Sequence, residues 1–169
     1  MSAYYNYCIV ALLLTTGFSG SVSGLQGQSD IRWTWANNNP MALEATDFHF
    51  TDANNGWLIS ANGVISRTRN GGQTWIDEFP GKWPALYGMD FTGDQTGFIV
   101  GEGGKILKTT DGGESWQITD SGIESTLRKI QMVSPAVGYI LGDQGTFLKT
   151  VDGGQNWNNI GVDGQLQLS

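Results

Sequence analysis

Asp111 and Asp152 are the side chains of this sequence that could most readily take part in chemistry, because both are carboxylates in a repeated sequence pattern. Each follows a threonine by two positions, precedes two glycines and is followed five positions later by a tryptophan. Carboxylate oxygens bind hard cations such as Ca²⁺ when several of them converge on one ion. These two aspartates are 41 positions apart, and each has turn amides of its own from which it can accept hydrogen bonds. We therefore expect each to cap its own turn, and the sequence predicts neither a metal site nor a cofactor.

The turn segment occurs three times at a spacing of 41, as Thr68–Trp75, Thr109–Trp116 and Thr150–Trp157. Asn70 replaces the aspartate in the first copy and can still accept the same hydrogen bonds. The second glycine of each copy supplies a backbone conformation that a side chain would obstruct, and the tryptophan anchors the hairpin by burying its ring. The residues predicted to build these structural turns are Thr68, Asn70, Gly72, Trp75, Thr109, Asp111, Gly113, Trp116, Thr150, Asp152, Gly154 and Trp157.

Other reactive side chains are few. His49 is the sole histidine of the sequence and Cys8 the sole cysteine, so the sequence offers no His/Cys zinc cluster and no disulfide. The glycine pairs lack the strand-to-helix context of a nucleotide-binding loop. A net charge of −7 disfavours nucleic acid as a partner, because that binding depends on basic contacts with phosphates.

The elements that must position these turns are short strands. Gly56–Ser60, Gly97–Gly101 and Gly138–Gly142 are nearly all apolar, as expected of strands covered on both faces. Hairpin signals recur at short intervals, and four strands in about 41 residues match one blade of a β-propeller. The sequence thus predicts an all-β fold, a partial β-propeller with a 41-residue repeat. Its three four-stranded blades are expected at about 47–79, 86–119 and 127–160 within a repeat region of 47–169.

The N-terminus has the features of an export signal. Tyr7–Thr16 is an apolar run too short to span a bilayer comfortably, and Val22–Gly24 is a plausible cleavage site. We expect residues 1–24 to be a signal peptide and the mature protein to be extracytoplasmic; the alternative is a buried N-terminal strand. Residues 25–46 then form a leader in which Ile31–Trp35 is the outer strand of a neighbouring blade.

The repeated unit resembles a known family. The turn fits the Asp-box, or bacterial neuraminidase repeat (BNR), and the segment Phe50–Ser60 with the following G-x-I/F-x-x-T-x-D-G-G-x-x-W unit is similar to the photosystem II assembly and stability factors and their bacterial relatives. The similarity extends from Trp33 to Asn159. It implies a non-enzymatic propeller in the periplasm, outside the cell or in the thylakoid lumen that binds a protein client, such as a membrane-protein assembly intermediate.

A carbohydrate-active or carbohydrate-binding propeller is the alternative function, because Asp-box propellers include sialidases. A sialidase needs three clustered arginines, a Tyr nucleophile with a Glu partner and an acid/base Asp. The arginines of this chain are Arg32, Arg67, Arg69 and Arg128, and two of them precede a turn, away from the usual sialidase pocket. Tyr87 is expected in the core. No catalytic residue is therefore predicted.

Loops that join strands are the expected partner surface. Trp83 and its neighbour Lys82 lie in the loop Phe79–Leu86, and loop tryptophans are enriched at binding hot spots. The alternative is that the Trp83 ring packs over a blade edge. The other loops expected on the same face are Ala61–Asn62, Glu102–Gly103, Ser121–Arg128 and Asp143–Gln144.

Three basic residues, Arg67, Lys108 and Lys149, recur at the spacing of 41 and so occupy the same place on each blade. They form either a basic patch that contacts a client, as in the assembly factors, or a solvated strand face that discourages edge pairing.

Closure of the propeller is the last open question. Propellers have about four to eight blades, so three would leave two blade faces uncovered. Either further blades belong to a longer chain, or copies of this chain self-associate into a ring.

Overall fold

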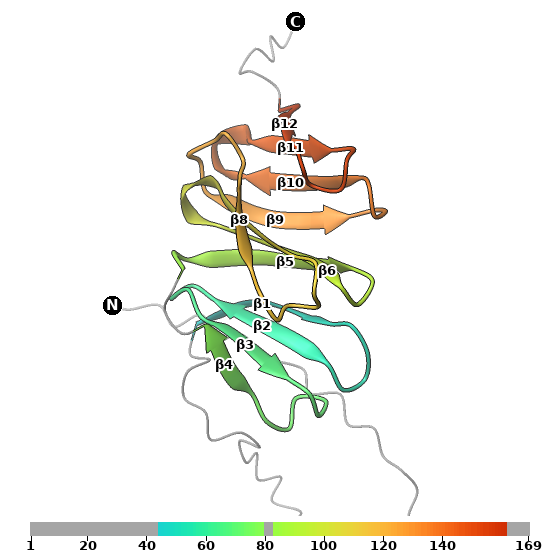
Figure 1. Cartoon of the computed structure of the whole chain (residues 1–169). Helices are drawn as coiled ribbons and strands as arrows, with labels where there is room; N and C mark the ends of the chain where they lie inside the picture. The colour runs from blue at the N-terminus through green and yellow to red at the C-terminus, as the bar shows by residue number, and fades with distance from the viewer. Residues whose placement is uncertain (1–43, 80–82, 162–169) are drawn as a thin grey trace, which may run out of the picture. The chain divides into compact units, whose positions relative to one another are not determined.

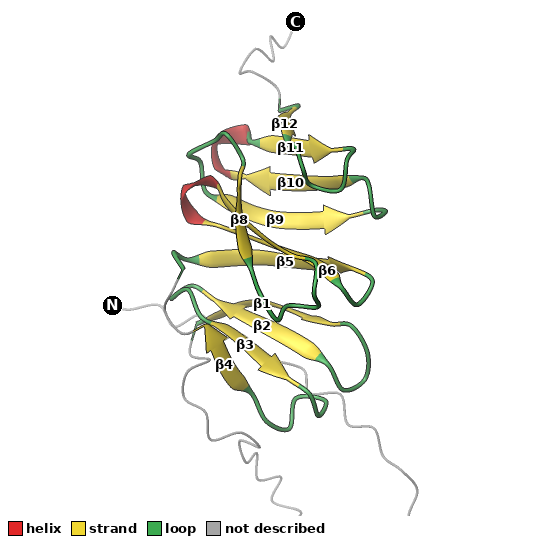
Figure 2. Cartoon of the chain, in the orientation of Figure 1, coloured by secondary structure: helices red, strands yellow, loops and turns green. Residues whose placement is uncertain are grey.

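The computed structural model describes residues 44–79 and 83–161. These residues form three antiparallel sheets of four strands each, arranged in the order of the chain from β1–β4 to β9–β12 (Figures 1 and 2). Each sheet is one blade, and the partial all-β propeller predicted from the sequence is confirmed. The predicted signal peptide (1–24), the strand Ile31–Trp35 and Lys82 lie outside the described residues.

Within each sheet the strands follow the order of the chain. The first sheet contains β1 (Ala45–Phe50), β2 (Gly56–Ser60), β3 (Ile65–Thr68) and β4 (Ile76–Phe79). The second contains β5 (Leu86–Thr92), β6 (Thr96–Gly101), β7 (Lys105–Thr109) and β8 (Gln117–Asp120). The third contains β9 (Leu127–Met132), β10 (Gly138–Gly142), β11 (Phe147–Thr150) and β12 (Asn158–Asn159).

Single 3₁₀ turns, η2 (Glu102–Gly104) and η3 (Asp143–Gly145), connect the middle strands of the second and third sheets. None of the helical segments in the described part of the chain has the length and apolar character needed to cross a membrane.

The middle hairpin of every sheet has the same register. Trp57 lies opposite Arg67, Phe98 opposite Lys108, and Tyr139 opposite Lys149. Residues opposite each other in an antiparallel pair share one face of the sheet. The 41-residue repeat of the sequence therefore places an aromatic ring and a basic side chain together on the same face of every blade.

The hydrophobic core lies between the sheets. In the described residues one buried cluster joins the first and second sheets, and another joins the second and third. The first consists of Trp57, Ile59, Ile65, Leu86, Met89, Phe91, Ile99, Leu107 and Trp116. The second consists of Phe98, Val100, Ile106, Leu127, Ile130, Ile140, Leu148 and Trp157. The second blade is thus covered on both faces by its neighbours, and the first and third blades are each covered on one face.

The tryptophan of the second turn should be among the most sensitive positions in the protein. Trp116 is 7% exposed, and its ring packs edge-on against Trp57 of the first sheet and Phe91, with centroid distances of 6.1 and 6.0 Å. We expect Trp116→Ala to lower the free energy of unfolding by about 3–5 kcal/mol, measured by urea denaturation.

Trp75 is the matched control, because it occupies the same position in the first repeat but is only half-buried and packs edge-on against Phe50. We expect Trp75→Ala to cost less than about 2 kcal/mol. Equal losses for the two variants would contradict the conclusion that contact between neighbouring blades provides most of this stability.

Candidate functional site

The oxygens of the Asp111 carboxylate are used by their own turn. Oδ1 accepts hydrogen bonds from the Thr109 hydroxyl at 2.6 Å and from the Ser115 amide at 3.0 Å, and Oδ2 accepts one from the Ser115 hydroxyl at 2.6 Å. The Ser115 hydroxyl, followed by the Thr109 hydroxyl and the Ser115 amide, lowers the pKa of Asp111 to about 2. Such a carboxylate is ionised at neutral pH and holds the turn closed.

The other two turns have the same construction. Asp152 accepts from the Asn156 amide at 3.0 Å and from the Asn156 side chain at 2.8 Å, and these bonds lower its pKa to about 2. In the first turn the uncharged Asn70 takes the place of the aspartate, and its Oδ1 accepts a hydrogen bond from the Thr74 amide at 2.9 Å. Within residues 44–79 and 83–161, no three His, Cys, Asp or Glu side chains converge as a metal site requires.

The second glycine of the turn reaches the preceding blade. Gly113 has a φ of 84°, and a Cβ added there would lie 2.3 Å from the Trp57 ring. Gly154 is related in the same way to Phe98, at 2.5 Å. These glycines are needed for their left-handed backbone and also because the neighbouring ring occupies the space of a side chain.

Two of the three repeated bases, Arg67 and Lys108, have a role that sequence reasoning missed. Arg67 lies over the Trp57 ring at 4.6 Å and forms an ion pair at 2.5 Å with Glu114 of the second sheet. Its side chain is only 14% exposed. Arg67 therefore fastens the first blade to the second, and this contact leaves little of it available to a client.

Lys108 makes the corresponding contact one blade later. Its ammonium group lies 5.4 Å from the Phe98 ring and donates a hydrogen bond of 2.7 Å to the carbonyl of Gly153 in the third sheet. Lys149 lies over Tyr139 at 5.7 Å on the outer side of the third sheet. The signal for this role was present in the sequence, because each base follows an aromatic residue by ten positions.

The loops expected on one face do lie beside each other. The amide of Glu102 donates to the carbonyl of Ala85, and the amide of Asp143 donates to the carbonyl of Thr126, both at 2.8 Å. A Cβ added at Gly63 would lie 1.8 Å from the Trp83 carbonyl oxygen. We call this surface the loop face, and it comprises residues 61–64, 83–85, 102–104, 121–126 and 143–145.

Trp83 is half-buried and packs, together with Phe79, against the cluster between the first and second sheets. This contact agrees with the alternative in which its ring covers a blade edge. A partner that binds the loop face would thus meet only part of the indole.

Arg128 and Asp143 form an ion pair at the edge of the loop face, with side chains 49% and 44% exposed. Nε and Nη2 of Arg128 donate to the two carboxylate oxygens of Asp143 at 2.9 and 2.7 Å. The guanidinium lies 4.5 Å from the ring of Tyr87, which is half-buried and not in the core as expected. The hydrogen bonds from Arg128 lower the pKa of Asp143. We call Tyr87, Arg128 and Asp143 the rim cluster.

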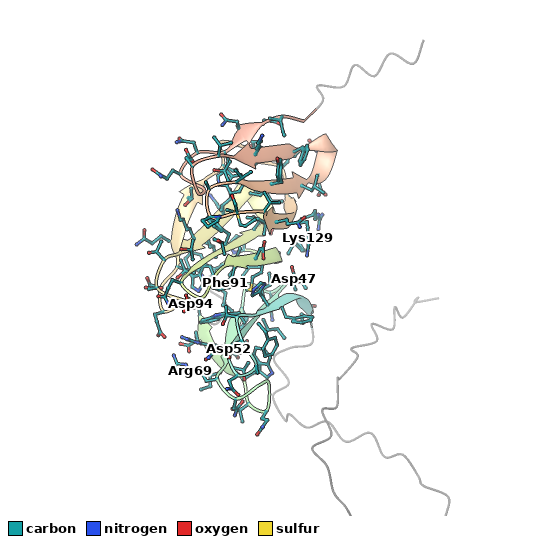
Figure 3. The ribbon with its side chains drawn as sticks, turned by 90° about the vertical axis from the view of Figure 1, so that its right-hand side faces the viewer. Asp47, Asp52, Arg69, Phe91, Asp94 and Lys129 are labelled. Carbon is teal, nitrogen blue, oxygen red and sulfur yellow. The ribbon has the colours of Figure 1, made fainter. Side chains whose placement is uncertain are left out.

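A row of polar side chains follows the first strands of the sheets, β1, β5 and β9. Asp47 accepts from the Met89 amide at 3.0 Å and from the Lys129 ammonium at 3.3 Å. His49 Nδ1 lies 3.6 Å from Asp90, whose other oxygen accepts from the Met132 amide at 2.6 Å. Figure 3 shows Asp47 and Lys129 together toward one side of the molecule, and Arg69 and Asp94 toward the other.

The arginines that a sialidase would need are not brought together. Arg67 and Arg69 share Glu114, whereas Arg128 is bound to Asp143 at the loop face. Arg32 lies outside the described residues.

Three consecutive Asp-box blades, joined by rings, bases and turns, define a β-propeller segment of the Asp-box class. The model of the family described as photosynthesis system II assembly factor YCF48 matches residues 27–117 and 78–168, which together span most of the sequence. The chain belongs to this family.

Solved structures show the same fold. The structure of YCF48 bound to D1 peptide is 31% identical with a TM-score of 0.61, over 69% of this chain and 40% of that one. YCF48 from Cyanidioschyzon merolae is 24% identical with a TM-score of 0.58, over 69% and 36%. An ancestral GH74 enzyme is 16% identical with a TM-score of 0.57, over 77% and 19%, and shows the fold alone. No curated protein matches this chain. The chain spans about two-fifths of the length of the YCF48 proteins it matches.

The capping carboxylates predict an acid dependence of stability. A folded pKa of about 2 for Asp111, below the unfolded value of about 3.9, stabilises the fold above pH 4, and this stabilisation is lost as the pH falls from 4 to 2. We expect Asp111→Ala to lower the urea midpoint at pH 7, and Asp111→Asn to lower it less, because Asn70 caps the first turn. The difference between the unmodified protein and Asp111→Asn should shrink from pH 4 to pH 2. A constant difference would show that the Asp111 charge does not stabilise its turn.

Proposed function

We propose that this chain is part of an exported, non-catalytic propeller that binds a protein client in the assembly of a membrane protein complex, through its loop face. The observation that carries the proposal is the rim cluster, in which an exposed arginine near the start of β9 is paired with Asp143 and lies 4.5 Å from an aromatic ring. A guanidinium held in one orientation can donate several hydrogen bonds to carboxylates and carbonyls of a peptide.

Family membership supports a peptide client. A family member has been solved with a D1 peptide bound, and the present chain is 31% identical to it over the matched blades. Within the described residues, Arg67, Lys108 and Lys129 are bound to Glu114, Gly153 and Asp47. Arg128 is likewise bound to Asp143, but this pair lies at the edge of the loop face with side chains 49% and 44% exposed, so a peptide can reach both groups.

A non-catalytic role is supported by the use of the polar side chains. The turn carboxylates accept hydrogen bonds within their turns, and the described arginines are divided between two carboxylates that belong to different blades. The similarity to GH74 enzymes adds no catalytic function, since at this identity it reflects the fold alone.

Peptide binding by the rim cluster can be tested directly. We expect the full chain to bind a fluorescein-labelled D1 peptide, and Arg128→Ala to weaken this binding about tenfold because charge-assisted hydrogen bonds are lost. Arg128→Lys should restore little affinity, since an ammonium group cannot donate in the same paired geometry. Fluorescence anisotropy measures the dissociation constants.

Arg69→Ala is the matched control, because Arg69 is also exposed and paired with a carboxylate, Glu114. It should change the affinity less than about twofold. Equal effects of Arg128→Ala and Arg69→Ala would show that the rim cluster is not part of the binding site.

Export is part of the proposal and rests on the sequence of residues 1–24. When the chain is expressed in a Gram-negative bacterium, we expect a periplasmic product whose N-terminal sequence begins near Leu25. Leu12→Arg, which places a charge in the apolar run, should keep the protein in the cytoplasm. An unprocessed protein in the cytoplasm would instead favour a buried N-terminal strand.

A further inference from the structure

Within residues 44–79 and 83–161, the first and third sheets each have a face that no other sheet covers. The open face of the third sheet carries Tyr139, Leu141, Phe147 and Lys149, and the open face of the first sheet carries Phe48, Phe50, Leu58 and Trp75. Exposure of large apolar groups in such patches marks a surface for association.

The third sheet exposes positions that are buried in the other two. Leu141 is 53% exposed, whereas Ile59 and Val100, its counterparts at the spacing of 41, are 0% exposed. Tyr139 and Phe147, stacked at 5.8 Å, are half-buried. The apolar character of the covered faces is thus retained on a face that no other described sheet covers.

The first sheet exposes the complementary positions. Phe48 is 65% exposed, whereas its counterpart Met89 is 3% exposed. Phe50 is 39% exposed, against 7% for Phe91. Trp75 is half-buried in the place of the buried Trp116.

The two internal junctions show what such faces bind. In each junction a ring of one blade packs edge-on against the turn tryptophan of the next, with distances of 6.1 Å for Trp57–Trp116 and 6.3 Å for Phe98–Trp157. A glycine of the same turn also contacts that ring. The open face of the first sheet offers both groups, as Trp75 and Gly72, which has a φ of 84°.

The charged contacts distinguish the junctions further. Arg67 meets Glu114 across the first junction, whereas Lys108 meets the Gly153 carbonyl across the second. The second junction has Gln155 at the position of Glu114 in the repeat.

The open face of the third sheet has Lys149 at the repeat position of Lys108, and the open face of the first sheet has Gln73 at that of Gln155. The two open faces therefore combine a lysine with a glutamine, as the second junction does. The carbonyl of Gly71 lies at the repeat position of Gly153, so it is the expected acceptor for Lys149. The open faces therefore match each other as the faces of the second junction do.

We propose that the open face of the third sheet binds the open face of the first sheet in a second copy of this chain. Tyr139 then packs against Trp75 and Gly72 of the second copy, and Lys149 donates to the carbonyl of its Gly71. Two such contacts related by a two-fold axis join the six described blades of two copies into a ring, within the range of propellers. This inference is independent of the proposed client.

The mass of the full 169-residue chain in solution tests the proposal. We expect sedimentation velocity at micromolar concentrations to give about twice the 18.3 kDa of one chain. Leu141→Asp and Phe48→Asp, on the two open faces, should each reduce this to one chain. Both side chains are more than half exposed, so the variants should fold, and a cooperative melt by circular dichroism checks this.

Ile118→Asp is the matched control, because Ile118 is 57% exposed on β8 of the middle sheet, which has neither open face. It should retain the double mass. Larger species that disappear in both open-face variants would also support the contact, as a head-to-tail chain that does not close.

Three results would overturn the proposal. The first is a folded monomer at all concentrations. The second is a dimer sensitive to Leu141→Asp but not to Phe48→Asp, which would mean that like faces pair. The third is a dimer unaffected by both substitutions, which would place its contact elsewhere in the chain.

Discussion

The contact between neighbouring blades is the interaction on which this structure depends. A four-stranded sheet has two faces, and one blade provides no second layer of its own to cover them. The repeat therefore has two complementary parts. One is a middle hairpin that presents an aromatic ring and a base, and the other is a turn that presents a tryptophan and a glycine. The capping carboxylate belongs to the same contact, because it holds the turn that contacts Trp57 or Phe98 of the preceding blade.

This arrangement also governs where binding can occur. Two of the bases that recur every 41 residues lie at the junctions between blades. Arg67 and Lys108 each lie over an aromatic ring and contact the next blade. The loops that connect strands need not pack against the next sheet, so their side chains are available to a partner. The rim cluster lies where the first strand of a blade leaves the loop face, and it joins Tyr87 of one blade to Arg128 of the next. A site for a client can therefore form across a junction without weakening the contacts that hold the blades.

The blades were predictable because their signals are local and repeated. A tryptophan, two glycines and a threonine return every 41 residues, and each signal refers to a turn within one blade. The rim cluster was not predictable in this way, because Arg128 and Asp143 meet through strand register and Tyr87 comes from another sheet. Arg67 and Glu114 are likewise 47 positions apart. Such pairs depend on the position of one blade relative to the next, and the sequence of a single repeat does not determine that position.

Differences between the repeats carry the remaining information about blade order. If all junctions had identical contacts, any blade could follow any other. Arg67 with Glu114 forms an ion pair, whereas Lys108 faces a backbone carbonyl beside Gln155. Joining the third blade to the second again would place Lys149 beside Glu114, and joining the first to the third would leave Arg67 beside Gln155 without its carboxylate. The second of these misplaced contacts loses the ion pair of Arg67, whose side chain is only 14% exposed, so the charges disfavour that order of blades.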